Sequence, residues 1–374
     1  MSTPTPPFRA DQVGSLLRPR YLLDAREQFA TGKIDAAVLR EVENRAIAEA
    51  VKKQEAIGLP SISDGEFRRS YFHLDFFRHL DGVTIEGNIN ASSSVQNSAG
   101  FSPPKLSVTG KLRHQYPISL GDYQFLQAQT PAKVKITMPS PTMLHFRGGR
   151  AGIDAKAYPD LEEFFSDLAQ AYRDEIETLY QAGCRNIQLD DTNLAYLCDP
   201  KMRADAAARG EDPNTLPALY ARIINAAIEH KHQDLTIGIH LCRGNFKSGW
   251  FASGGYEPVA DVLFNSLNVN SYYLEFDDER SGDFSPLRFV PASKFVVLGL
   301  VSSKIGALET RDSIIARLEE AANYMPKNNM GLSPQCGFSS TSHGNNLTEE
   351  QQWNKLRFVV DVAKEVWGTA GSAR

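Results

Sequence analysis

Metal-binding side chains follow a pattern in this sequence. His240 and Cys242 are two positions apart, so on a strand both point to the same side, where an imidazole nitrogen and a thiolate can bind one metal ion. Cys336 lies further along the chain, and Glu275 lies between them. The four residues offer a set of nitrogen, sulfur and oxygen ligands that suits tetrahedral Zn²⁺. The alternative is that the histidine and the cysteines are buried core residues.

Carboxylates form the second group of candidates. Asp190 and Asp191 close one predicted strand, and because alternate side chains face opposite sides, at most one is expected to point into a site. The alternative for one of them is to cap the following helix. Glu66 could offer a carboxylate to a substrate ammonium, or pair with Arg68 and Arg69 on the surface. The spacing alone leaves these alternatives open.

One aromatic residue and two further thiols complete the candidates. Phe146 follows a predicted strand, where its ring could stack on a planar heterocycle or pack in the core. Cys184 and Cys198 fall at a helix end and in a loop. We interpret both as inert thiols.

The elements that would position these residues alternate along the chain. Short apolar or β-branched runs predict eight strands, separated by amphipathic stretches that predict helices. The predicted strands are 12–17, 59–64, 134–139, 186–191, 236–242, 272–277, 295–302 and 330–336. This order predicts an α/β fold, a (β/α)8 TIM barrel, in which the carboxyl ends of the strands share the face that carries the active site. The competing topology is a doubly wound sheet, but no G-x-G-x-x-G motif follows the first strand.

The sequence also predicts the end of one helix and the bounds of an insertion. The helix predicted to end at Gly58 is expected to bury one apolar face, made of Val38, Val42, Ile47 and Val51. The stretch of about 81–130 is too long for a simple loop, and the alternation at 106–112 predicts a hairpin strand. We therefore expect a single catalytic domain over 1–374 with an inserted hairpin and loop excursion.

The composition narrows the class of partner. The chain has 374 residues and a formal net charge of −5, without the basic surface that nucleic acid or an anionic membrane requires. Its longest strongly apolar run, 295–301, is far shorter than the roughly 20 residues of a spanning helix. Four cysteines and no apolar signal segment predict a cytoplasmic protein with reduced thiols. Small-molecule partners are therefore expected.

Several segments resemble one known family. They are DQVGSLLRP, SDGEFRRS, ITMPSPTMLHFRG, IQLDDTNLAYL, IHLCRGN, YYLEFDDERSGDF, VLGLVSSK, LSPQCGFSS and LTEEQQWNKLRFVVDVAKEVW. Together they resemble the cobalamin-independent methionine synthase family, and most closely its short bacterial members that consist of the catalytic barrel alone. The likeness runs from about residue 8 to residue 367 and is specific, because H-x-C, the later Glu and the final Q-C-G occur in the family's order.

The resemblance implies roles for individual residues. It implies a zinc site formed by His240, Cys242, Glu275 and Cys336. It also implies a homocysteine pocket formed by Ser15, Glu66 and Asp190, with Gly14 in the same first-strand motif. Two positions depart from the family pattern: Asp191 replaces a glutamate, and Phe146 stands where the long synthases carry a tryptophan that stacks on the pterin.

The implied reaction is methyl transfer from a 5-methyltetrahydrofolate, with or without a polyglutamate tail, to the thiol of homocysteine. Zinc would activate the thiol, and Asp191 is the candidate that delivers a proton to the leaving nitrogen. The alternative within the same fold uses a corrinoid methyl donor, or coenzyme M as the thiol. Glu66 and Asp190 favour an acceptor with an ammonium group, which coenzyme M lacks. A purely structural zinc site is the alternative from another class.

Overall fold

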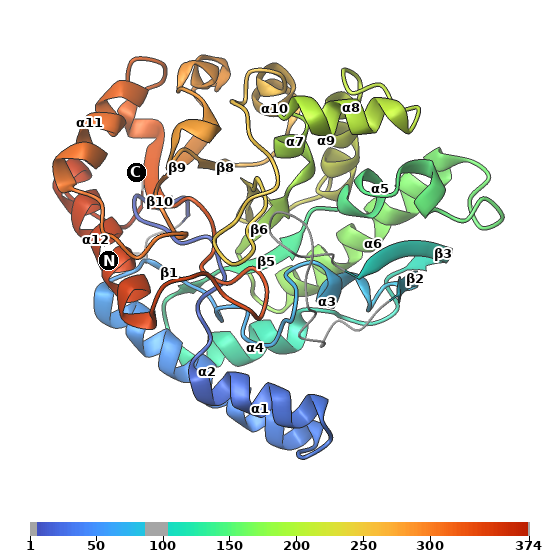
Figure 1. Cartoon of the computed structure of the whole chain (residues 1–374), viewed down its shortest axis with the longest axis horizontal. Coiled ribbons are helices and arrows are strands. Elements are labelled where there is room, and N and C mark those ends of the chain that lie inside the picture. The colour runs from blue at the N-terminus through green and yellow to red at the C-terminus, as the bar shows by residue number, and fades with distance from the viewer. Residues whose placement is uncertain (1–5, 87–103, 373–374) are drawn as a thin grey trace.

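The computed structural model describes residues 6–86 and 104–372 (Figure 1). Its α-helices are α1 (Arg20–Ala30), α2 (Ala36–Ile57), α3 (Leu74–Phe77), α4 (Leu120–Gln129), α5 (Met143–Phe146), α6 (Leu161–Gln181), α7 (Asn193–Tyr196), α8 (Pro200–Ala208), α9 (Leu216–Ala227), α10 (Ala260–Ser266), α11 (Arg311–Ala321) and α12 (Glu349–Trp367). Its strands are β1 (Ser61–Ile62), β2 (Asp81–Glu86), β3 (Lys105–Arg113), β4 (Lys133–Val134), β5 (Ile136–Pro139), β6 (Asn186–Asp191), β7 (Thr236–Leu241), β8 (Ser271–Glu275), β9 (Phe295–Val301) and β10 (Met330–Pro334).

Six parallel strands form the main sheet, in the order β10-β9-β8-β7-β6-β5. Helices lie around the outside of these strands (Figure 1). Consecutive strands are neighbours and run in one direction, so their carboxyl ends meet along one edge. In the register of this sheet, His240 lies between Asp190 on β6 and Tyr273 on β8. The predicted site residues at strand ends are therefore brought to a common edge.

The predicted eight-stranded barrel is present only in part. β1 pairs in parallel with β4, and this pair is separate from the six-stranded sheet, although one residue alone lies between β4 and β5. The described strands thus form an α/β fold with a parallel sheet, and the hydrogen-bonded ladder does not close into a ring.

The predicted strand at 12–17 is wrong, since this segment has no regular strand. Its carbonyl groups are bonded by buried side chains rather than by a neighbouring strand. Lys135 Nζ donates to the carbonyl of Gln12, and Gln188 Nε2 donates to the carbonyl of Val13 at 2.6 Å. Side chains that occupy these positions interrupt a backbone ladder. The segment is instead an irregular stretch that carries site residues.

Helix α2 begins and ends as its sequence predicts. The Asp35 side chain accepts a hydrogen bond from Val38 N, and Gly58 ends the helix with φ of 82°. Ile47 and Val51 are buried, as expected, but Val38 is 42% exposed. The predicted apolar face therefore starts too early, because the first turn of α2 lies beside α1 at the periphery (Figure 1).

An antiparallel hairpin is added to the parallel fold. β2 pairs with β3, with Val83 opposite Val108. This ladder confirms the hairpin strand predicted at 106–112. The predicted insertion of about 81–130 also includes 87–103, which lie outside the described residues.

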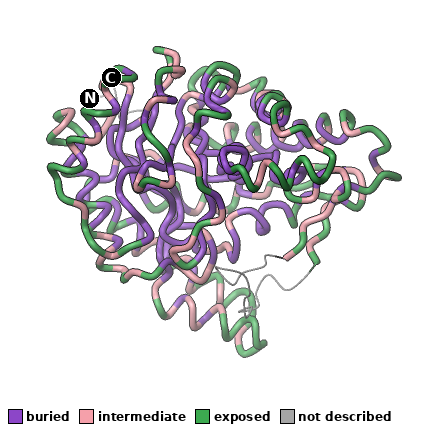
Figure 2. Tube along the Cα trace, turned by 45° about the horizontal axis from the view of Figure 1, so that its top comes forward, coloured by how far each residue is buried: buried purple, intermediate pink, exposed green. Residues whose placement is uncertain are grey.

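The strands of the main sheet form the centre of the core. Every residue of β6, β8, β9 and β10 is buried, as in parallel sheets covered on both faces. Figure 2 shows buried residues concentrated in the interior, with exposed residues along the outer helices and loops. Among residues 6–86 and 104–372, no helix has both the length and the apolar character needed to cross a membrane.

Candidate metal centre and active site

Four side chains from the carboxyl ends of β7, β8 and β10 converge at the edge of the sheet. Their ligand atoms all lie within 4.8 Å of one another, and all four residues are buried. Glu275 is the last residue of β8, and the others belong to or follow β7 and β10. The residues are His240, Cys242, Glu275 and Cys336. The structure thus assembles the predicted set into one group that can hold a metal ion.

The distances and hydrogen bonds in this group fit a metal ion. The sulfurs of Cys242 and Cys336 are 3.4 Å apart, too far for a disulfide of about 2.05 Å. Two Zn–S bonds of about 2.3 Å at the tetrahedral angle would separate the sulfurs by about 3.7 Å. His240 Nε2 and Glu275 Oε1 are buried and have no hydrogen-bond partner in the described part of the chain, which is uncommon for buried polar atoms. A bound cation would satisfy both atoms.

Neighbouring groups orient two of these ligands. His240 Nδ1 lies 3.2 Å from the carbonyl of Tyr273, so Nδ1 donates this bond and Nε2 remains as the ligand atom. Glu275 Oε2 accepts a hydrogen bond from Arg243 N at 3.0 Å and lies 3.8 Å from Arg280 Nη2. Glu275 Oε1 is therefore the oxygen left for a metal. Sequence reasoning did not identify either arginine.

A narrow cavity opens beside the cluster. It measures about 20 Å³, close to the volume needed for a single water molecule, so a larger ligand enters only when lining side chains move apart. Its lining residues are Val13, Ser15, Glu66, Phe72, Asp190, Thr192, His240, Cys242, Cys336, Gly337 and Ser340. Three of the predicted ligands and the predicted substrate residues Ser15, Glu66 and Asp190 thus share one cavity.

Glu66 is held in place by buried polar partners. Its Oε1 accepts a hydrogen bond from Thr137 Oγ1 at 2.7 Å and lies 3.5 Å from Arg69 Nη1. The pairing with Arg69 thus does form, but in a buried position, and burial raises the pKa of Glu66. A Cβ at Gly14 would lie 2.9 Å from Glu66 Oε1 and 2.7 Å from Thr137 Cγ2. Gly14, with φ of +135°, therefore makes room for the glutamate.

Asp190 places a second carboxylate at the cavity. Its Oδ1 accepts a hydrogen bond from Gln188 Nε2 at 2.7 Å. Burial, together with the Glu66 carboxylate, raises the pKa of Asp190 to about 7. Two acids that face one cavity repel each other when both are ionised, and a cation between them would relieve this repulsion. The arrangement favours a ligand with a positive group.

Ser15 lies against the loop that follows β10. Its Oγ accepts a hydrogen bond from Ser339 N at 3.3 Å. A Cβ at Gly337 would lie only 1.9 Å from Ser15 Oγ, so a residue with a side chain at 337 would displace the serine. Gly337 thus lets the loop carrying Cys336 approach Ser15 closely.

Asp191 does not reach this cavity. Its Oδ1 accepts a hydrogen bond from Leu194 N at 2.8 Å, and its Oδ2 accepts one from Thr142 Oγ1 at 2.8 Å. Asp191 is fully buried, while Asp190 lines the cavity. Asp191 thus bonds the first turn of α7 from the position before the N-cap, Thr192, which agrees with the helix-capping alternative more than with a role in the cavity. Its predicted role as a proton donor disagrees with this placement, because both of its oxygens are engaged away from the site.

Phe146 also lies away from the cavity. Its ring centroid is 5.9 Å from that of Tyr196 and 6.1 Å from that of Tyr220, and Arg209 Cζ lies 5.7 Å from its centre. The side chain is buried in this aromatic group. The structure therefore favours the packing alternative over stacking on a ligand, because the ring packs among these side chains and Phe146 does not line the cavity described above.

The two remaining cysteines are buried away from the cluster. Burial raises the pKa of Cys184 to about 11 and that of Cys198 to about 12. Since the thiolate is the reactive form, both thiols are unreactive near neutral pH. Their environment agrees with the interpretation of both as inert.

Comparison with known proteins identifies relatives of the chain. A Bacillus subtilis protein, uncharacterized protein YxjH, is 48% identical over 96% of this chain and 95% of its own length. Methionine synthase from Pyrococcus abyssi is 26% identical over 95% of this chain and 92% of its own length. A Listeria monocytogenes structure, proposed to be a vitamin-B12-independent methionine synthase, is 38% identical with a TM-score of 0.78, covering 97% of this chain and 99% of that one.

Residues 9–365 match the family described as the catalytic domain of the cobalamin-independent synthase. The match includes every residue of the cluster and of the cavity described above. The chain therefore belongs to the cobalamin-independent synthase family, a family of methyltransferase enzymes.

Proposed function

We propose that this protein transfers a methyl group from a 5-methyltetrahydrofolate to the thiol of homocysteine, forming methionine, with zinc as its metal. One observation carries the proposal: the cluster of two thiols, an imidazole and a carboxylate adjoins a cavity with two further carboxylates. A relative from Bifidobacterium animalis, 25% identical, is named 5-methyltetrahydropteroyltriglutamate–homocysteine methyltransferase, which supports the same reaction here.

The acceptor is inferred from the charges of the cavity. Glu66 and Asp190 would bind the ammonium group of an amino acid, while Ser15 Oγ is positioned to donate to its carboxylate. The thiol of homocysteine would then reach the cluster formed with Cys242 and Cys336. Coenzyme M has no ammonium group, so the two carboxylates favour homocysteine.

Zinc is proposed because the donor set combines soft sulfur with imidazole. When bound, zinc lowers the pKa of an incoming thiol, so that the sulfur can react as a thiolate near neutral pH. His240 Nε2 and Glu275 Oε1 would be its nitrogen and oxygen ligands. A carboxylate in the set argues against a closed structural site, because such sites consist mostly of cysteine and histidine.

The barrel architecture and the single domain over 1–374 belong to this proposal. The irregular segment before α1 forms backbone hydrogen bonds near both the first and the last strand, β1 and β10. Ala10 forms a parallel bridge to Leu332 of β10, and Leu16 N donates to the carbonyl of Gly65, just after β1, at 3.0 Å. We infer that this segment occupies the first strand position of a (β/α)8 barrel, with an irregular backbone that serves the site.

The proposed reaction is tested with purified, zinc-loaded protein. We expect methionine to form from homocysteine with 5-methyltetrahydrofolate or its triglutamate form, measured by mass spectrometry. Cys242 and Cys336 give the bound zinc two sulfur neighbours. X-ray absorption at the zinc edge should show a third sulfur neighbour when homocysteine is added. Methyl transfer only from methylcobalamin would overturn the assigned donor, and transfer only to coenzyme M would overturn the assigned acceptor. Zinc coordination that does not change when homocysteine is added would favour a structural metal.

A Glu66→Gln variant is expected to bind homocysteine more weakly while it keeps its metal. A charge-assisted hydrogen bond contributes about 1.5–3 kcal/mol, so the KM should rise about 10- to 100-fold with a smaller change in kcat. Steady-state kinetics and metal analysis measure these effects.

The control for Glu66→Gln is a different acceptor. 4-Sulfanylbutanoate has the thiol and the carboxylate of homocysteine without the ammonium group. The native protein and the variant should use it equally well. If the variant lost as much activity with this acceptor as with homocysteine, Glu66 would not recognise the ammonium.

A further inference from the structure

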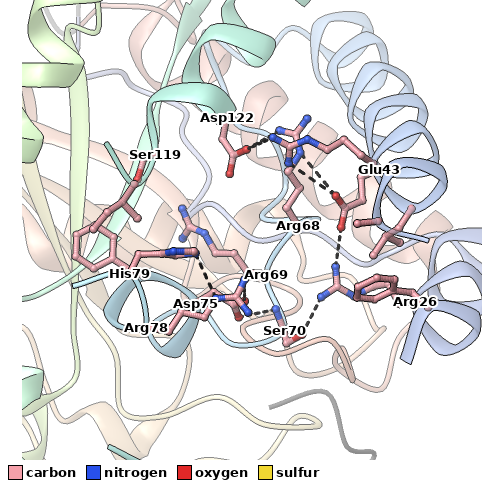
Figure 3. Close-up of a pocket in the computed structure, with 16 residues that line it drawn as sticks. Arg26, Glu43, Arg68, Arg69, Ser70, Asp75, Arg78, His79, Ser119 and Asp122 are labelled. Carbon is pink, nitrogen blue, oxygen red and sulfur yellow. Dashed lines mark hydrogen bonds and ion pairs between the residues drawn. The ribbon is translucent and has the colours of Figure 1, made fainter. Parts of the chain in front are cut away.

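A second and much larger cavity lies outside the proposed active site. It measures about 410 Å³, within the range of small-molecule pockets. Residues of α1, α2 and α3, the start of α4 and the segment after β1 form its walls. Figure 3 shows polar side chains from several of these elements gathered around it. Arg69 is the one residue of this lining that the proposed methyl transfer also uses, since it pairs with Glu66.

Guanidinium groups dominate the lining. Arginines outnumber the acidic residues of the lining by two. The arginines are Arg26, Arg40, Arg68, Arg69 and Arg78. The imidazole of His79 also lines the cavity, and burial lowers its pKa, so that it adds no charge near pH 7. The cavity is therefore positive although the chain as a whole is negative.

The acids of the lining only partly neutralise these arginines. Burial raises the pKa of Glu43 and that of Asp122, which disfavours their ionised forms. Asp75 uses its Oδ2 to accept hydrogen bonds from the backbone N–H groups of Ser70 and Tyr71, at 2.7 and 2.8 Å. Even with all three acids ionised, the five arginines exceed them, so ion pairs within the lining leave it positively charged.

Several guanidinium donors remain for a ligand. The side chain of Arg68 is only 5% exposed, and its buried Nε has no hydrogen-bond partner within residues 6–86 and 104–372; the nearest paired oxygen, Glu43 Oε2, is 3.8 Å away. Arg40 and Arg78 are 48% and 42% exposed, and their best ion pairs are 3.3 Å to Asp122 and 3.2 Å to Asp75. A buried donor without a partner in a cavity that two accessible arginines also line indicates a site for an external acceptor.

Four of the five arginines form two groups across the cavity. Arg40 and Arg68 both contact Asp122. Arg78 contacts Asp75 instead, and Figure 3 shows it beside Arg69, apart from Arg68 and Asp122. Planar guanidinium groups match carboxylate and phosphate oxygens in pairs. We propose that this cavity binds a small metabolite that carries two oxyanionic groups, either carboxylates or phosphates, one at each arginine group.

The proposal is tested by calorimetry on the full chain without any methyl donor or acceptor. The probes are glutarate and pyrophosphate, compared with acetate and inorganic phosphate at constant ionic strength. At least one two-group anion should bind with a dissociation constant about tenfold or more below that of its single-group counterpart. Stronger binding of glutarate would identify a dicarboxylate as the ligand class, and stronger binding of pyrophosphate a phosphorylated metabolite.

Variants test where the anion binds. Arg40→Gln and Arg78→Gln should each weaken this binding about tenfold, since each removes a charge-assisted contact at one arginine group. Arg45→Gln is the matched control, because Arg45 is on the same helix as Arg40 but is 69% exposed and outside the lining. Lack of saturable binding, equal affinity for one-group and two-group anions, or an equal loss in the Arg45 variant would overturn the proposal. Thermal melting confirms that each variant is folded.

Discussion

A Cys336→Ser variant is expected to lose both its metal and its methyl-transfer activity. Cys336 contributes one of two sulfurs in the cluster, and its Sγ lies 3.4 Å from that of Cys242. A serine hydroxyl stays protonated near neutral pH and is a poor ligand for zinc. Loss of an outer partner of a metal ligand already costs about 10- to 100-fold in metal affinity, so loss of a ligand should exceed about 100-fold. Metal analysis after dialysis and methionine formation measure the two losses.

The matched control for Cys336→Ser is Cys184→Ser. Cys184 is buried like Cys336, but its Sγ donates to the carbonyl of Asn186, at 3.6 Å, and Cys184 does not belong to the metal-binding cluster. This variant should keep its metal and its activity, with a change in stability alone. If Cys336→Ser kept its metal, or if Cys184→Ser lost it as well, the assignment of Cys336 as a ligand would be wrong.

The sequence was sufficient to place the cluster because strand geometry is regular. Alternation puts His240 and Cys242 on the same side, and parallel pairing brings β7, β8, β9 and β10 into register. The carboxyl ends of these strands then lie together without further information. Glu275 lies beside the two cysteines because of the order of the strands in the sheet. Short sequence patterns predict this strand order, and they therefore predicted the cluster.

Side-chain direction at the end of a strand was less predictable. Adjacent residues on β6 face opposite sides, so only one of Asp190 and Asp191 could reach the cavity; alternation did not identify which, and only the family resemblance assigned Asp190 to the pocket. The deciding contact is the hydrogen bond from Leu194 N to Asp191, which depends on the turn into α7. Phe146 likewise packs against residues from distant segments, Tyr196 and Tyr220. No local pattern indicates such packing.

The partners that hold the site residues could not be found from spacing either. Arg69 reaches Thr137 with hydrogen bonds of 3.0 and 2.6 Å, and Thr137 in turn bonds Glu66. These residues are far apart in the sequence, and threonine and arginine are common in positions without any role. Their function depends on the tertiary fold, which brings β5 against the segment after β1.

A Lys135→Met variant is expected to lose about 3–5 kcal/mol of folding free energy, because it leaves a buried carboxylate without its partner. Lys135 and Asp11 are fully buried, and Lys135 Nζ lies 3.1 Å from Asp11 Oδ1. Lys135 Nζ also donates to Gln188 Oε1 at 2.9 Å, and Tyr273 OH donates to Asp11 Oδ2 at 2.7 Å. Urea unfolding followed by circular dichroism measures the loss.

Two further variants separate the buried charge from other causes of this instability. Lys135→Met combined with Asp11→Asn removes both charges, and the double variant should regain part of the lost stability, because an unpaired buried charge costs more than a neutral amide. Lys327→Met breaks an exposed ion pair with Glu319 and should change stability by less than about 1 kcal/mol. If Lys135→Met cost no more than Lys327→Met, the ion pair would not hold the irregular 12–17 segment in place. Gln188 links Lys135 to Asp190 at the cavity. A large loss of folding free energy in Lys135→Met would therefore mean that the same buried charges support the fold and position Asp190, the carboxylate proposed to bind the substrate.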